Sequence, residues 1–366
     1  MTDSLIPHLA ARRKGCVALN NRQTAARMRI LAGLKSGVYA EKPLPCLCRS
    51  FPDNRSAEVA LDTLIASCDR YGIPLRTVLC NQCGLLRSDP YLDDPTLAHF
   101  YTHDYRDLYA PDEFADPNVL FTQQHEIGNI VLSRALPFLA IPGAHVIEVG
   151  CGAGGILSRF QEIGAIVQGC DLDERYLSLG ARQLGEKILF HGEIAELPDS
   201  SPGDMVILRH VLEHFRNPVE QLFKVKHRLS PRGLIYLEVP GIFSIRDTYG
   251  SIEPFLQNAH AWHWCVSSLD RLMSHVGFER LAGTEEVWAI YRQATNAKTR
   301  LPYDGEVLAA KVRASLRKTD RLRYVPSRAE LVRRIVAVLN LMLGSRHAEA
   351  LIRRIKSFFS KTTQRR

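Results

Sequence analysis

The chain has 366 residues, 46% of them hydrophobic and 23% charged, and its formal net charge is +8. This composition is typical of globular proteins and excludes a chain that is disordered or fibrous throughout. At roughly 150 residues a domain, the length predicts two or three domains. We expect neither a signal peptide, because no basic segment followed by an apolar run opens the chain, nor a membrane span, because the densest apolar stretch is only residues 335–343. The sequence therefore favours a soluble, cytoplasmic protein.

The positive charge is concentrated at the C-terminal end. Residues 298–366 hold 18 Lys and Arg against 5 Asp and Glu, whereas the rest of the chain holds 29 against 34. A protein with a uniform basic surface for nucleic acid would not show this asymmetry. The distribution indicates a mildly acidic body with a basic C-terminal extension.

Residues 1–43 form a predicted helical segment, in which apolar side chains recur at helical spacing: Ala25, Met28, Leu31 and Leu34. A cysteine module over residues 44–100 follows, with one close pair at Cys46 and Cys48 and another at Cys80 and Cys83. Two pairs of thiolates from two turns are what a tetrahedral zinc site needs, and Gly84 suits the tight turn of a zinc knuckle. The first pair is Cys-x-Cys and 31 residues separate the pairs, so buried thiols that pack as small apolar groups are the alternative. Four thiolates would close the coordination sphere, which makes the expected zinc structural.

The third predicted domain covers residues 101–295. Residues 123–139 have a helical pattern, and strand and helix patterns then alternate, with strands expected at 145–149, 165–170, 187–190, 204–208 and 233–239. Such alternation implies parallel pairing and a doubly wound α/β sheet.

A glycine-rich turn follows the first of these strands. Gly150, Gly152 and Gly155 fit the dinucleotide pattern G-x-G-x-x-G, while Gly150, Gly152 and Gly154 fit the G-x-G-x-G of S-adenosylmethionine (SAM) enzymes. Asp171, at the end of the second strand, suits the ribose of either cofactor. Glu148 favours SAM, because a carboxylate at this turn repels a pyrophosphate and attracts an ammonium and a sulfonium. A dehydrogenase is the less favoured alternative.

The segment Val146-Ile-Glu-Val-Gly-Cys-Gly-Ala-Gly154 resembles the first motif of class I SAM-dependent methyltransferases. Other matches are Gly169-Cys-Asp171, Gly192-Glu-Ile194, Val211-Leu-Glu-His214 with Asn217-Pro218, and His260-Ala-Trp-His263, the last two resembling the subfamily of ubiquinone-type enzymes. The segment Cys80-Asn-Gln-Cys-Gly-Leu-Leu-Arg-Ser-Asp-Pro90 resembles the zinc-binding domain fused to sugar C-methyltransferases, which act on nucleotide-linked sugars. Two features depart from that pattern: Pro45 stands in place of the first cysteine, and the segment after residue 295 is short, basic and helix-like where that family continues into a third α/β domain.

The resemblance implies a set of SAM-binding residues. Glu148 and the turn would face the methionine part, Asp171 the ribose, and Leu172 the adenine, which Glu193 and Ile194 would border. The full candidate set is Glu148, Gly150, Cys151, Gly152, Gly154, Asp171, Leu172, Glu193, Ile194 and Arg209.

Methyl transfer to a carbon or hydroxyl also needs a base, for which His260 is the first candidate and His263 and His210 are the next. His214 is expected to be structural and to bond to backbone near the sheet. Trp262 and Trp264 are expected in the core, with stacking on a sugar as the alternative, and Tyr101 and Tyr105 are candidates to close over the cofactor.

The sequence thus predicts a SAM-dependent methyltransferase acting on a small molecule, with a nucleotide-linked sugar or glycan precursor favoured. RNA methylation through the basic tail is the less favoured alternative, and a non-catalytic SAM-binding scaffold is another. Residues 296–366 form the predicted basic helical extension, with apolar positions beside Arg333, Arg334, Arg353, Arg354 and Lys356. This extension is open to three interpretations: contact with the inner face of the membrane, self-association, and packing on its own chain.

Overall fold

The computed structural model describes residues 4–51, 62–109, 117–198, 202–294 and 304–326, together with 331 and 335. Within these residues, no helix is long and apolar enough to cross a membrane. Most of the predicted basic extension lies outside the described residues, except for the helix α11 (Gly305–Arg321).

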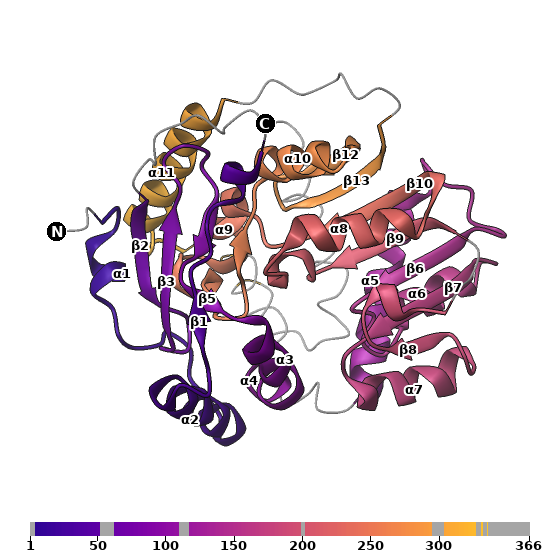
Figure 1. The fold of residues 1–366 in the computed structure, drawn as a ribbon, viewed down its shortest axis with the longest axis horizontal. Coiled ribbons are helices and arrows are strands. Elements are labelled where there is room, and N and C mark those ends of the chain that lie inside the picture. The colour runs from indigo at the N-terminus through magenta and orange to yellow at the C-terminus, as the bar shows by residue number, and fades with distance from the viewer. Residues whose placement is uncertain are drawn as a thin grey trace.

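A seven-stranded mixed sheet forms the larger part of the fold (Figure 1). Its order is β12-β13-β10-β9-β6-β7-β8, and five neighbouring strands are parallel: β6 (His145–Val149), β7 (Ile166–Asp171), β8 (Leu189–His191), β9 (Gly203–Arg209) and β10 (Leu229–Glu238). The doubly wound arrangement predicted from the sequence is confirmed. The hairpin of β12 (Phe278–Thr284) and β13 (Trp288–Gln293) was not predicted, and β13 joins the sheet antiparallel to β10.

Helices cover both faces of this sheet because successive residues of a strand point to opposite sides. Val146 of β6 packs in a core with α5 (Pro117–Ala135), α6 (Gly155–Gln161) and α7 (Glu174–Leu184). Its neighbour Ile147 belongs to the core on the other face, with α8 (Pro218–His227) and α10 (Val266–His275). The central strands β6, β7 and β9 are largely buried on both faces, which explains why they appear as continuous apolar runs in the sequence.

A four-stranded antiparallel sheet carries the cysteine module, in the order β11-β4-β3-β2. Its strands are β2 (Thr63–Cys68), β3 (Pro74–Leu79), β4 (Leu86–Ser88) and β11 (Trp262–His263). The strand β11 comes from the large domain, and it pairs with β4 through Trp262 opposite Arg87 and His263 opposite Leu86. The proposed boundary near residue 100 is therefore crossed by a shared sheet.

Short elements connect the two sheets: α3 (Asp94–His103) and α4 (Tyr105–Tyr109) lie between them in Figure 1. The predicted N-terminal helix is α2 (Asn21–Ser36), which begins at a capping box formed by Asn20 and Gln23 and ends at Gly37 with φ of 80°. The remaining elements are α1 (Pro7–Ala11), β1 (Glu41–Lys42), β5 (Tyr91–Leu92) and α9 (Ile245–Tyr249), with short 3₁₀ turns at Leu47–Ser50, Ile194–Glu196, Leu212–His214, Ile242–Ser244 and Glu253–Phe255.

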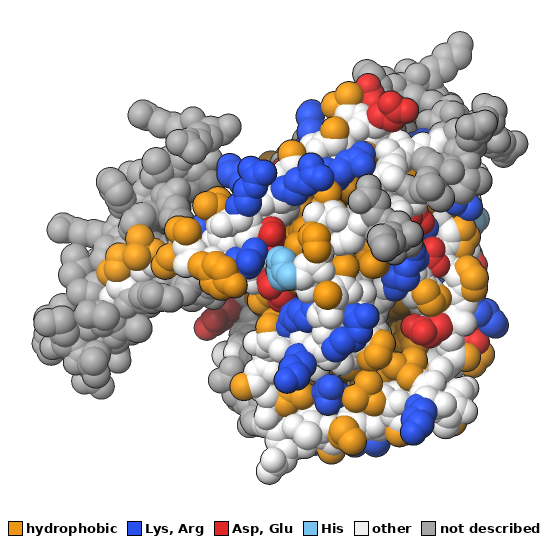
Figure 2. Space-filling view, turned by 90° about the vertical axis from the view of Figure 1, so that its left-hand side faces the viewer, with side chains coloured by type: hydrophobic (Ala, Val, Ile, Leu, Met, Phe, Trp, Pro, Cys, Tyr) orange, Lys and Arg blue, Asp and Glu red, His pale blue; other side chains and the backbone are white. Residues whose placement is uncertain are grey.

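The helix α11 packs on the cysteine module through Leu308, Ala309, Val312 and Leu316, all of which are buried. Its opposite face exposes basic side chains: Lys311, Arg317, Lys318 and Arg321. Figure 2 shows Lys and Arg side chains gathered on the face of the molecule where α1 and α11 lie. The described part of the predicted extension is thus an amphipathic helix that packs on its own chain.

Candidate functional site

The glycine-rich turn lies where β6 ends and α6 begins. Gly150, Gly152 and Gly154 all have positive φ angles, of 70°, 55° and 77°. A Cβ atom on Gly150 would lie 2.6 Å from Cγ2 of Val211, and one on Gly152 would lie 2.7 Å from Nε2 of Gln124. Both the left-handed backbone and the close neighbours therefore favour glycine, and the turn lies at the carboxyl end of the sheet, where open α/β sheets bind their ligands. Cys151, the side chain between them, is fully buried in the core below.

Asp171 ends the neighbouring strand β7 and bonds to this turn. Its Oδ2 accepts a hydrogen bond of 2.8 Å from the backbone N–H of Gly152, and its Oδ1 accepts one of 2.9 Å from that of Asp173. The carboxylate is therefore fixed at the edge of the turn, in the position predicted for a ribose partner. Leu172 follows with half of its surface exposed, which is unusual for a leucine beside a buried strand and provides an apolar surface for a flat ring.

Glu148 is almost completely buried one residue before the end of β6, and its Oε2 has no hydrogen-bond partner within the described residues. Burial raises the pKa of this carboxyl well above its usual range, while the charge of Arg209 opposes that rise. Arg209, at the end of β9, donates from Nε to Oε1 of Glu238 at 3.1 Å. An orphaned buried oxygen at the mouth of a glycine turn indicates a ligand that donates a hydrogen bond or carries positive charge.

The two residues predicted to border the adenine differ in their exposure. Ile194 is buried after β8, whereas the side chain of Glu193 is half exposed and lies 3.2 Å from Nζ of Lys224 on α8. Both stay candidates, with Ile194 as the apolar one.

An arginine from the N-terminal half of the chain, Arg106, lies beside the carboxylate of Asp171. Arg106 of α4 places Nη2 at 3.6 Å from Oδ1 of Asp171 and Nε at 3.3 Å from Oδ2 of Asp173. Its guanidinium carbon lies 4.6 Å from the centre of the Tyr176 ring. The segment α3–α4, which carries the predicted Tyr101 and Tyr105, therefore contacts the end of β7 through Arg106, a residue to which no role was assigned from the sequence.

A cluster of ionisable side chains lies at the next strand end, beyond β9. Glu213, His214 and His260 each place one ligand atom within 4.8 Å of the others. His214 bonds through Nδ1 to the carbonyl oxygen of Ala259 at 2.8 Å, as the structural expectation for this residue required. Because a carbonyl only accepts, Nδ1 carries the proton and the lone pair of His214 is on Nε2. Burial lowers the pKa of His214, so the ring is neutral and able to accept a proton.

The three predicted catalytic histidines lie at different depths in this cluster. The His260 ring is 5.0 Å from that of His214 and 5.8 Å from that of His263, and burial lowers the pKa of His260 well below its usual range. His263 is buried, neither of its ring nitrogens has a partner within the described residues, and burial lowers its pKa to about 4. His210 is partly exposed and has a left-handed backbone, with φ of 54°, and its Nδ1 lies 3.3 Å from Oε1 of Glu213.

Two of the predicted aromatic residues contact the cluster, and two others lie in the core. The rings of Tyr101 and Tyr105 lie 5.9 and 5.8 Å from that of His214, so in this structure they contact the histidines. Trp262 and Trp264 are fully buried, which agrees with the expected core positions. Glu213 was visible in the Leu-Glu-His segment but received no role from the sequence, although it is buried with Oε2 unpartnered within the described residues.

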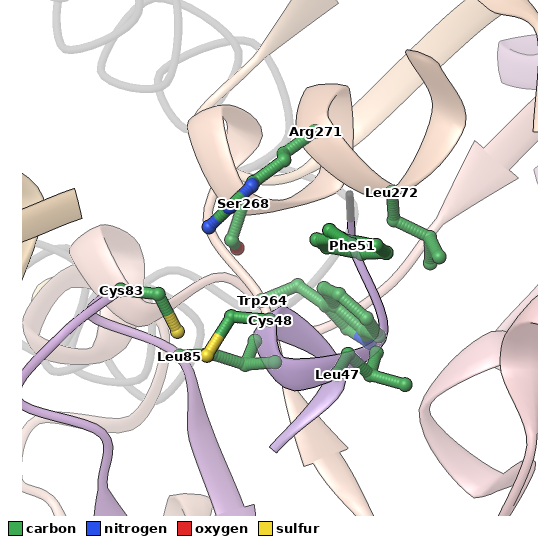
Figure 3. Close-up of a pocket in the computed structure, with 9 residues that line it drawn as sticks. All are labelled: Leu47, Cys48, Phe51, Cys83, Leu85, Trp264, Ser268, Arg271 and Leu272. Atoms are coloured by element: carbon green, nitrogen blue, oxygen red, sulfur yellow. The ribbon is translucent and has the colours of Figure 1, made fainter. Parts of the chain in front are cut away.

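The four predicted metal ligands converge. The sulfur atoms of Cys46, Cys48, Cys80 and Cys83 are buried and lie within 4.8 Å of one another, with 3.4 Å between Cys46 and Cys83 and 3.8 Å between Cys48 and Cys80. A tetrahedral zinc ion with Zn–S bonds of about 2.3 Å holds its sulfurs about 3.8 Å apart, so the four thiols fit this ion. Figure 3 shows Cys48 and Cys83 beside a small pocket that Phe51, Trp264 and Leu272 help to line.

The structure has a tight turn at the second pair, where the sequence suggested a zinc knuckle. The backbone N–H of Gly84 donates to the carbonyl of Cys80 at 2.9 Å, and Gly84 has φ of 75°. The first pair lies at the start of the 3₁₀ turn Leu47–Ser50, which brings Cys46 and Cys48 to the same side despite the single residue between them. The Cys-x-Cys spacing is therefore compatible with a four-sulfur site.

Residues 123–282 match a family model described as a methyltransferase domain. An ubiquinone biosynthesis O-methyltransferase from Dechloromonas aromatica is 32% identical over 129 residues, which are 33% of this chain and 55% of that protein. A probable S-adenosylmethionine-dependent methyltransferase from Mycolicibacterium smegmatis is 26% identical over 179 residues, which are 48% of this chain and 65% of that protein. The chain thus spans about half the length of the curated relatives it matches.

Two solved structures give the same picture of partial coverage. An amino pentose methyltransferase from Micromonospora echinaspora aligns with a TM-score of 0.37 and 14% identity, over 47% of this chain and 92% of that one. A 1,6-didemethyltoxoflavin-N1-methyltransferase from Burkholderia thailandensis aligns with a TM-score of 0.40 and 18% identity, over 57% of this chain and 95% of that one. In both alignments a large part of this chain is left without a counterpart.

Proposed function

We propose that this protein, in which residues 123–282 form a class I SAM-dependent methyltransferase domain, transfers a methyl group from SAM to a small-molecule acceptor. The observation that carries the proposal is the continuity of two sites along one sheet edge. The glycine turn with Glu148 and Asp171 ends β6 and β7, and the cluster of Glu213 and His260 follows the neighbouring strand β9. A cofactor and an acceptor held at these two places would be adjacent.

The chain fits SAM at the first of these places. We propose that the turn and Glu148 hold the methionine part, that Asp171 holds the ribose, and that Leu172 and Ile194 hold the adenine. The support is the position of the turn at the carboxyl end of β6, the fixed carboxylate of Asp171 and the orphaned oxygen of Glu148. The orphaned carboxyl suits the ligand ammonium, because a cation is the partner that makes ionisation of a buried acid favourable.

SAM supplies a methyl group that is already activated on a sulfonium, so the protein mainly has to align the acceptor and remove its proton. His260 remains the proposed base, with His263 and His210 as the other candidates from the sequence. We add His214 as a candidate, because its bond to the carbonyl of Ala259 fixes the proton on Nδ1 and leaves Nε2 able to accept one. Glu213, which lies against His210 and His214, would stabilise the imidazolium that forms.

For the acceptor we propose a nucleotide-linked sugar or a related glycan precursor. The support is the resemblance of the cysteine module to the domain that sugar C-methyltransferases carry, together with the buried polar atoms of the cluster, which suit a polar molecule. We further propose that Cys46, Cys48, Cys80 and Cys83 bind zinc, which would crosslink the module without entering the reaction.

Calorimetric titration with S-adenosylhomocysteine (SAH), with NAD as the control ligand, tests the cofactor. We expect SAH to bind and NAD not to bind, and we expect Asp171→Ala to weaken SAH binding by roughly tenfold to a hundredfold, as for the loss of one or two hydrogen bonds to a charged group. Glu174→Gln, a change of an exposed acid three residues away, is the matched control and should leave the affinity unchanged. Absence of SAH binding to the unaltered protein would overturn the proposal.

Formation of SAH from SAM on addition of nucleotide-linked sugars then tests the acceptor. Turnover with such a sugar supports the full proposal. SAH binding without turnover on any of them would exclude this acceptor class and favour the scaffold.

A further inference from the structure

The hairpin between β2 and β3 brings an arginine of the cysteine module to the edge of the histidine cluster. Arg70 lies at its tip, with its guanidinium carbon 4.8 Å from the centre of the Tyr71 ring and 5.1 Å from that of Tyr109. Its Nη2 donates to the hydroxyl of Tyr71 at 2.8 Å, and its backbone N–H donates to the carbonyl of Leu256 at 2.9 Å. Two aromatic faces and two hydrogen bonds therefore fix the position of this cation.

The charge of Arg70 has no carboxylate partner. Within the described residues, no Asp or Glu oxygen lies within 4.0 Å of it, and its Nε is buried without a hydrogen-bond acceptor. The neighbouring Asp69 does not pair with Arg70, since its Oδ1 accepts hydrogen bonds from the backbone N–H groups of Tyr71 and Ile73. A partly buried guanidinium with an unused donor is the kind of group that proteins keep for an anionic ligand.

Arg70 is connected through Tyr109 to the place proposed for the acceptor. Tyr109, on which it stacks, is followed by a chain of ring contacts: 5.1 Å to Tyr105, 5.8 Å from there to His214 and 5.0 Å to His260. Burial lowers the pKa of His260, and the charge of Arg70 contributes to the same shift. Arg70 is therefore within electrostatic reach of the proposed base.

Among the charged groups named for this region, Arg70 is the cation that is available to bind an anionic ligand. Asp69 precedes it in the chain and is fully buried, Glu213 lies against His210, and Arg106 is occupied with Asp171 and Asp173. The cluster thus contains the acid Glu213, while the cation Arg70 nearby has no carboxylate partner within the described residues. A polar acceptor with an acidic group would satisfy both the cation and the orphaned polar atoms.

From these contacts we infer that Arg70 binds an oxyanion of the acceptor, a phosphate or a carboxylate, and thereby sets the substrate class. The inference rests on the proposed methyltransferase function. A guanidinium offers two parallel donors to such a group, and the stacking on Tyr71 and Tyr109 orients that fork before the ligand arrives. The cysteine module would then contribute directly to substrate recognition.

The experiment uses the full-length protein saturated with SAH and titrated with inorganic pyrophosphate or with acetate, at constant ionic strength. We expect one of these anions to bind, Arg70→Gln to weaken that binding at least tenfold, and Arg70→Lys, which keeps the charge but not the fork, to weaken it less. Arg76→Gln is the matched control, because Arg76 is an exposed arginine on β3 that donates only to the carbonyl of Asp89. This control should bind the anion like the unaltered protein.

Three results decide the inference. Equal anion binding by Arg70→Gln, or no binding of either anion to the SAH-loaded protein, would overturn it. Equal losses in Arg70→Gln and Arg76→Gln would also overturn it, since they would reflect surface charge alone. SAH affinity is measured first for every variant, so that a failure of the proposed cofactor site is recognised separately from a failure of anion binding.

Discussion

The strongest test of the proposed cofactor site is to measure whether Glu148 releases a proton when SAH binds. Burial raises the pKa of this carboxyl well above its usual range, and among the nearby charges Arg209 lowers it while Asp171 raises it. The empty site therefore holds a neutral acid over part of the accessible pH range. A ligand ammonium placed beside it would favour the ionised form, so binding should release up to about one proton in that range.

The magnitude follows from this linkage. At pH values below the raised pKa, the association constant of SAH should increase by up to about tenfold for each pH unit, which corresponds to about 1.4 kcal/mol. The affinity should rise, and not fall, with pH, because a low pH keeps Glu148 protonated and thus removes the negative charge that would attract the ligand ammonium. Glu148→Gln keeps the volume and polarity of the side chain but has no proton to release, so its affinity should be lower at high pH and nearly independent of pH.

Calorimetric titration with SAH in phosphate and in Tris, at matched pH between 6 and 7.5, measures the proton directly, because the two buffers differ in ionisation enthalpy. We expect the apparent enthalpy of the unaltered protein to differ between the buffers and that of Glu148→Gln to differ much less. Any contribution from the ligand ammonium is common to both proteins. Equal proton release by the two proteins would refute the assignment of Glu148 to the cationic end of the cofactor.

Two further predictions concern the stability of the fold. Burial raises the pKa of Asp69 to about 7, so the unfolded chain releases this proton first and stability falls as the pH rises from about 4 to 7. Urea unfolding should show the unaltered protein losing about 2 kcal/mol relative to Asp69→Asn between pH 5 and pH 7, and parallel curves would contradict this. Cys80→Ser should lose bound zinc, measured by atomic absorption, and should lower the melting temperature more than Cys16→Ser, a change of an exposed cysteine; equal zinc in both variants would exclude the four-sulfur site.

The parallel part of the large sheet was predictable because most of its strands are largely buried on both faces. β6 was expected at residues 145–149 and lies at His145–Val149, and the other four parallel strands overlap their predicted ranges. The hairpin β12–β13 was missed because β12 has only one buried residue, Phe278, and thus gives no apolar run. Edge strands of this kind are stabilised by pairing more than by their own composition.

The residues proposed for the cofactor have a clearer signal in the sequence than those proposed for the acceptor, for a similar reason. Gly150 and Asp171 come directly after predicted strands, and parallel strands bring their carboxyl ends together. Arg106 of a short helix reaches Asp171, and Arg70 of a hairpin stacks on Tyr109, but the docking of neither element has a local signal in the sequence. Glu213 stands in the Leu-Glu-His segment of the sequence, but only its contact with two histidines in the structure suggests a role for it.

The histidine cluster depends on the cysteine module for its position. The carbonyl of His260 accepts from Oγ of Ser88 at 2.8 Å, and the carbonyl of Ala259 accepts from the hydroxyl of Tyr91 at 2.7 Å. The next residues form β11, which pairs with β4 only a few residues after the knuckle at Cys83. A metal ion that fixes the knuckle would therefore also fix β4 and, through it, the segment that carries His260. If the four cysteines bind zinc as proposed, loss of the ion would displace this segment and thereby lower the proposed activity, although the proposed reaction uses no cysteine.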